Sequence, residues 1–371
     1  MHGNRGSGGA ETDPSGGPPV LELLARQRLA WTGARHRRGW NVATVDTAQR
    51  GVVSVADDRA RGLSLTVMLL VLVAALFTSG LDGPAGWIVL AAGLLVGLPH
   101  GAVDHLVPGW VLGRPLPRQT FTMVVAGYIA VAAAAFALFA FQPVLAAALF
   151  LVVSVGHFGA GDVEIHEAQT GRRLRGRPSA VLAFGLPAIA LPIAIHPDAV
   201  TPVLAGLAPS LTALTAPGVR VALLAFTVIA VGTTAVIALA DGRGRVALDL
   251  LVLVAVFAVA PPLIAFAAYF GCWHAARHIG RLLTLDPANR EDLARGRLAR
   301  PLLRFAGSAA GPTAISVAVL AGLWWGAGGV EGLVAAHLGL LLALTMPHVA
   351  VVSWLDRRRG AHRSDARQVP A

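Results

Sequence analysis

The sequence predicts an all-α integral membrane protein, a polytopic bundle of about nine or ten transmembrane helices. Hydrophobic residues make up 55% of the 371 positions and charged residues only 13%, and the mean hydropathy is +0.66. These values lie outside the range of soluble globular domains. The apolar residues form runs of about 20, the length that a helix needs to cross the hydrocarbon core. All basic residues are arginines, mostly in short segments between these runs, which favours control of topology over nucleic-acid binding.

The two ends of the chain lack long apolar runs. Residues 1–60 are rich in Gly, Arg, Ser and Asp and predict a disordered cytoplasmic tail. Residues 61–356 are expected to form the transmembrane bundle, and residues 357–371 a disordered basic tail.

Ten apolar segments are predicted to span the membrane. Pro261 and Pro262 divide the run 246–280 into two segments, and this division returns the arginine-rich loop 281–304 to the cytoplasmic side, as the positive-inside rule requires. Both termini are then expected in the cytoplasm of a cell-membrane protein. The predicted spans are 63–81, 85–107, 120–141, 144–163, 178–196, 218–240, 246–260, 263–280, 308–326 and 333–355.

Histidines recur in four of these spans, always toward the predicted cytoplasmic end. Ionisable side chains at membrane depth are costly and usually functional. At 1.5 Å per residue, three of these helices bring a histidine to a common depth about 10 Å before the cytoplasmic end. The histidines are His100 and His105 in the second span, His157 in the fourth, His274 and His278 in the eighth, and His348 in the tenth.

Four of these histidines predict a metal centre. His274 and His278 are spaced i, i+4, so one helix face can present both imidazoles to one ion, and His100 and His157 would complete the set from two other helices. The single cysteine, Cys272, excludes a thiolate cluster. An all-imidazole set suits Zn, Cu or Fe, and open positions for O2 and substrate favour ferrous iron over tetrahedral zinc.

Other residues near these histidines have expected supporting roles. Asp104, Asp162 and Glu164 could each accept the spare ring N–H of a ligand, and Arg277 could neutralise one of these acids. His105 and His348 are further candidates outside the set of four. Neighbouring glycines would let helices approach closely, namely Gly97, Gly101, Gly156, Gly159 and Gly161.

A site at this depth is most easily reached by a lipid-soluble substrate that passes between helices. Aromatic side chains could line such a path, among them Phe158, Tyr269, Phe270, Trp273, Trp324 and Trp325.

The ordered motifs GLPHGAVDH, GHFGAGD, HAARH and MPHVAVV resemble the Brp/Blh family of β-carotene-cleaving oxygenases, found beside opsins, over roughly residues 85–355. The resemblance implies an Fe(2+)-dependent dioxygenase that cleaves the central double bond of β-carotene with O2 to give two molecules of retinal. It implies His100, His157, His274 and His278 as the iron ligands, membrane lipid and a carotenoid as partners, and a functional link to an opsin.

Two other functions remain open from the residues. A di-iron membrane desaturase or hydroxylase also uses histidines at cytoplasmic helix ends, but it normally needs about eight of them, and this chain has one HxxxH pair. A proton-coupled transporter would need polar residues through both halves of the membrane, and the outer halves of these spans are almost entirely apolar.

Overall fold

A computed structural model of the chain describes residues 42–77, 84–326 and 330–365. The chain divides into two compact units, 1–49 and 50–371, and only residues 42–49 of the first are described. The core, the cavity and the candidate site described below all lie in the second unit.

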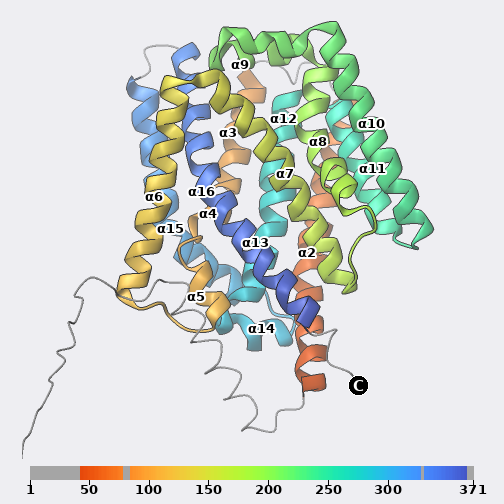
Figure 1. The fold of residues 1–371 in the computed structure, drawn as a ribbon, viewed down its shortest axis with the longest axis vertical. Helices are drawn as coiled ribbons and strands as arrows, with labels where there is room; N and C mark the ends of the chain where they lie inside the picture. The colour runs from red at the N-terminus through yellow and green to blue at the C-terminus, as the bar shows by residue number, and fades with distance from the viewer. Residues whose placement is uncertain (1–41, 78–83, 327–329, 366–371) are drawn as a thin grey trace, which may run out of the picture. The chain divides into compact units, whose positions relative to one another are not determined.

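The described residues form helices and connecting turns, without a strand (Figure 1). The α-helices are α2 (Val42–Phe77), α3 (Pro84–Gly97), α4 (Pro99–Ala102), α5 (Val107–Leu112), α6 (Arg118–Phe141), α7 (Pro143–Thr170), α8 (Arg177–Ile195), α9 (Pro197–Leu207), α10 (Pro217–Ala240), α11 (Gly244–Val259), α12 (Pro262–Ala268), α13 (Ala276–Leu285), α14 (Arg290–Ala294), α15 (Ala299–Gly326) and α16 (Val330–Asp365). Among these residues, eight helices are long and apolar enough to cross a membrane, which confirms the predicted all-α membrane bundle.

The remaining two expected spans, 246–260 and 263–280, are helical but differ from the eight. The first is α11, which has 16 residues. The second consists of α12, a π-helical segment η2 (Tyr269–Ala275) and α13 in direct succession. The expected division at the two prolines is confirmed, because α11 ends at Val259 and Pro262 begins α12, where a missing backbone N–H costs nothing.

The second predicted span, 85–107, is confirmed over residues 85–102 but ends earlier than expected, and it is interrupted at Leu98. Helix α3 ends at Gly97, and α4 starts at Pro99, whose ring lacks an N–H and would clash with the preceding turn of a continuing helix. Residues 103–106 then form turns before α5, so His105 lies in a turn.

The expected tails also differ from the structure. Helix α2 begins at Val42 and therefore includes residues 42–60, and α16 continues to Asp365 and includes residues 357–365. The other residues of these predicted tails, 1–41 and 366–371, lie outside the described part of the chain.

Helices α7 and α8 pack with their backbones in contact. A Cβ atom at Gly159 of α7 would collide with the carbonyl of Val181, and one at Gly185 of α8 would collide with the carbonyl of Val155. Small residues permit such close approach between membrane helices. The paired glycines therefore fix the position of α7, the helix that carries His157. The glycine prediction holds for Gly159, and for Gly97 and Gly101, where a Cβ would meet the rings of Phe270 and His348, but not for Gly156 or Gly161, beside which a Cβ would meet open space.

Candidate metal centre

Five imidazoles gather in the interior of the bundle. Each is buried, with 5 to 7% of its surface exposed. The ring centroid of His100 lies 4.7 Å from that of His348, 5.2 Å from His274 and 5.7 Å from His278, and the His157 ring lies 4.9 Å from both His274 and His348. We call these residues the histidine cluster. They come from α4, α7, η2, α13 and α16: His100, His157, His274, His278 and His348.

Local backbone features position several of these rings. Proline starts the short helix α4 immediately before His100, and Pro347 precedes His348 within α16. His274 lies in η2, and π-helical turns are rare insertions that often occur at functional sites. His278 follows one turn later, so the rings of His274 and His278 stand parallel, with 9° between their planes and 6.4 Å between centroids.

The nitrogen positions fit a metal ion. The Nε2 atoms of His157 and His274 lie 3.2 Å apart. Two nitrogens bound to one ion at about 2.1 Å would lie roughly 3.0 to 3.4 Å apart for coordination angles of about 90° to 109°. His100, His274 and His348 each offer a nitrogen within 4.8 Å of the other two. The Nε2 atoms of His278 and His348 are buried and have no hydrogen-bond partner, as metal-ligating nitrogens would.

Contacts on the far side of two rings fix which nitrogen faces the cluster. His100 Nδ1 lies 2.5 Å from the carbonyl oxygen of Gly97, and His348 Nδ1 lies 2.8 Å from Asp104 Oδ2. Because both partners accept, the neutral rings carry their proton on Nδ1 and leave the Nε2 lone pair free for a ligand. Asp104 therefore supports an imidazole of the cluster. That imidazole belongs to His348, which lies outside the predicted set of four ligands.

The other predicted supporting residues form ion pairs, and two of them, Asp162 and Arg277, line a small cavity together with three histidines of the cluster. Asp162 accepts hydrogen bonds from the Trp273 indole and from Arg277 Nη1, the latter at 2.9 Å, so Arg277 does neutralise an acid as predicted. Glu164 pairs with Arg177 at 2.8 Å. These contacts are with arginines and an indole, and the role of either acid behind a ligand ring stays a prediction.

His105 is also outside the cluster. Its ring packs against Phe121 of α6, with 5.8 Å between the ring centroids. The turn that replaces the expected helix after α4 carries it to this position.

A buried charge network that was not predicted from the sequence lies beside the cluster. Asp249 of α11 is fully buried and lies 2.6 Å from Arg61, 3.0 Å from Arg277 and 3.3 Å from His166. A lone acid in the apolar run 246–260 was the available signal for this network, because a charge at membrane depth requires a partner.

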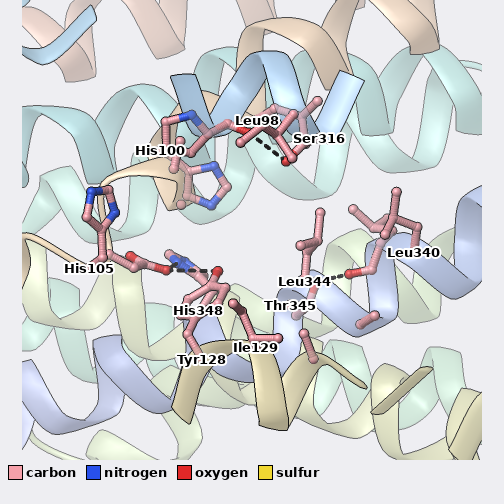
Figure 2. Close-up of a pocket in the computed structure, with 18 of the residues that line it drawn as sticks. Leu98, His100, His105, Tyr128, Ile129, Ser316, Leu340, Leu344, Thr345 and His348 are labelled. Atoms are coloured by element: carbon pink, nitrogen blue, oxygen red, sulfur yellow. Dashed lines mark hydrogen bonds and ion pairs between the residues drawn. The ribbon is translucent and has the colours of Figure 1, made fainter. Parts of the chain in front are cut away.

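A cavity of about 720 Å³ adjoins the cluster, and four cluster residues, all but His278, form part of its wall. Figure 2 shows His100 and His348 at this cavity, with Tyr128 of α6 beside His348. The rest of the wall is mostly apolar and comes mainly from α6, α7, α15 and α16, with Leu98 before α4 and Phe270 of η2. The volume of the cavity is in the range of small-molecule sites. Apolar wall residues include Leu98, Ile129, Phe136, Phe150, Ile315 and Leu344.

The predicted aromatic path is confirmed only in part. Phe158 and Phe270 line the cavity. Tyr269 and Trp273 are fully buried in the main apolar core instead, and Trp325 is 92% exposed on the surface. The side chain of Trp324 lies outside the described residues.

The known proteins and the family that resemble this chain are all named for the same enzymatic activity. The sequence model of the family "Beta-carotene 15,15'-dioxygenase" matches residues 91–356. A probable β-carotene 15,15'-dioxygenase Blh of Halobacterium salinarum is 32% identical over 297 residues, 73% of this chain and 84% of the relative. A probable β-carotene 15,15'-dioxygenase Brp of the same organism is 29% identical over 355 residues, 82% of this chain and 96% of the relative. A β-carotene 15,15'-dioxygenase of uncultured marine bacterium 66A03 is 26% identical over 192 residues, 52% of this chain and 67% of the relative. No solved structure matches the chain.

Proposed function

The chain belongs to the β-carotene 15,15'-dioxygenase family, and on that premise we propose that it cleaves the central double bond of β-carotene with O2 to give two molecules of retinal. The reaction breaks the central C=C bond of the carotenoid and the O=O bond of O2 and forms two C=O bonds, and no proton is gained or lost. The observation that carries the proposal is that the histidine cluster forms part of the wall of a large, mostly apolar cavity.

The proposal assigns a ferrous ion to the cluster. Its ligands would be His100, His157, His274 and His278, as the family resemblance implies, joined by His348, whose Nε2 is buried without a partner. Neutral imidazoles suit this ion, which when bound supplies the activation of O2.

The side chains of the chain itself would bind and orient the polyene. Burial of a long apolar substrate against the apolar cavity wall is favourable relative to water. The wall can hold the central double bond beside the cluster. Apolar walls also exclude water from reactive intermediates.

Replacement of single cluster histidines tests the proposal. We expect His157→Ala and His274→Ala to abolish retinal formation, measured by chromatography in cells that make β-carotene, and to lower the iron content of the purified protein. His196→Gln is the matched control, because His196 lies at the start of α9, outside the cavity wall. Full retinal formation by either alanine variant would contradict the assignment.

The geometry gives less support to the rival enzyme class, a di-iron membrane desaturase or hydroxylase. Five imidazoles gather among the described residues, whereas a di-iron desaturase or hydroxylase normally needs about eight. Elemental analysis separates the two proposals, since one iron per chain is expected here and two for the rival.

The cellular membrane, the orientation of the termini and the link to an opsin are also proposals. Eight helices among the described residues are suited to a membrane, and we propose the cell membrane, with both termini in the cytoplasm, and a functional link to an opsin that receives the retinal. Labelling of a single cysteine introduced near each terminus, from either side of the membrane, tests the orientation.

A further inference from the structure

Asp104 lies at a polar corner of the cavity, between the cluster and α6. Its side chain is 1% exposed, and it lies in the turn that follows α4. Oδ2 accepts a hydrogen bond from His348 Nδ1 at 2.8 Å and a longer one from the Tyr128 hydroxyl at 3.4 Å. Figure 2 shows the two partners of this carboxylate, Tyr128 and His348, next to each other at the cavity. A buried carboxylate in a membrane bundle is costly, so it requires a compensating role.

The contact with Asp104 determines what His348 can do. An acceptor at Nδ1 requires the ring proton on that nitrogen, so the lone pair is on Nε2. Nε2 is buried and unpartnered, and the ring of His348 is 4.7 to 5.3 Å from those of three other cluster members, His100, His157 and His278. A carboxylate behind an imidazole also raises its basicity toward a metal.

The backbone near α4 leaves space for this arrangement. A Cβ atom at Gly101 would lie 3.3 Å from His348 Nδ1 and 3.8 Å from Asp104 Oδ2. The first distance is tighter than ordinary van der Waals contact, so a side chain at residue 101 would press on the hydrogen bond.

We propose that Asp104 is a positioning residue that holds His348 as a further ligand of the metal centre, and that Tyr128 in turn orients the Asp104 carboxylate. This inference rests on the proposed function only in that it requires a metal in the histidine cluster. Tyr128, a residue of the cavity wall on α6, is thereby linked through Asp104 to His348 on α16.

Cobalt binding to the purified full-length protein tests the proposal without the oxidative reaction. Co(2+) gives visible absorption bands that report its ligand set. We expect Asp104→Leu to weaken Co(2+) binding about 10- to 100-fold and to change these bands. Asp104→Asn retains an acceptor oxygen and should lose less affinity, and Tyr128→Phe should lose about 2- to 10-fold, as for a single neutral hydrogen bond.

A double variant distinguishes positioning from a general structural effect. If Asp104 acts through His348, Asp104→Leu should cost little further affinity in a His348→Ala background. Asp198→Leu is the matched control, because Asp198 is exposed at the start of α9. It should bind Co(2+) as the unaltered protein does.

The possible results distinguish a failure of the positioning role of Asp104 from a failure of the proposed function. Unchanged affinity and bands in Asp104→Leu, or additive losses in the double variant, would overturn the positioning role and leave the proposed function intact. An unaltered protein that binds no Co(2+) would overturn the metal centre itself, and with it both proposals. Altered Co(2+) binding in a protein that forms no retinal would support the positioning role and count against the proposed reaction alone.

Discussion

Arg277 of α13 and Asp162 of α7 form a buried ion pair, with Nη1 2.9 Å from Oδ1 and both side chains less than 5% exposed. The guanidinium also stacks on Trp273, 3.5 Å from the ring centroid. Asp162 is five residues beyond His157, and Arg277 lies between His274 and His278. The pair therefore connects α7, which carries His157, to α13, which carries His278 and directly follows His274 in η2.

Loss of this ion pair should destabilise the fold. We expect Arg277→Met to lower the free energy of unfolding by about 3 to 5 kcal/mol, because the Asp162 charge would remain buried with one partner fewer. Thermal unfolding in detergent measures the change. Arg295→Met is the control, since its pair with Glu291 is exposed and worth about 0 to 1 kcal/mol. Equal unfolding temperatures for the two variants would contradict this account.

The contact between α7 and α8 gives a second prediction. Gly159→Ala should lower the unfolding temperature and disturb metal binding, because its methyl group would force α7 away from Val181 and move His157. Gly161→Ala adds the same methyl group to the same helix where nothing lies within 4 Å, and should be tolerated. A Gly159→Ala variant as stable as Gly161→Ala would show that these helices are not in such close contact.

The volume of the cavity should control substrate cleavage without affecting the metal. Ala132→Trp places a large ring in the α6 wall, and we expect about 5- to 150-fold slower retinal formation, from a typical overpacking cost of about 1 to 3 kcal/mol. Metal content should be unchanged. Ala130→Trp is the control, because Ala130 is exposed on α6 and does not line the cavity. Equal rates in the two variants would exclude this cavity as the substrate site.

Removal of the metal should weaken the fold. An ion that binds only the folded protein stabilises it by about 2.7 kcal/mol at a free concentration 100 times its dissociation constant. Treatment with a chelator should therefore lower the unfolding temperature, and Fe(2+) under anaerobic conditions should restore it. His274→Ala should show little response to either treatment. A large response in that variant would place the ion outside the histidine cluster.

Sequence patterns that depend on a single helix predicted the architecture well. Hydropathy identified the membrane helices, and the double proline correctly divided 246–280, because both effects act within a few turns of one segment. The i, i+4 spacing of His274 and His278 and the shared depth of His100 and His157 likewise follow from helix geometry.

Only the tertiary structure decided which helices face each other. The sequence alone determined that this is a helical membrane protein with histidines at one depth. Helix depth does not specify rotation about the helix axis or the choice of neighbour, so it could not show that His348 joins the cluster while His105 turns away. For the same reason the partners of Asp104, Asp162 and Asp249 emerged only from packing, since a buried charge is stabilised by whichever opposite group lies next to it in space.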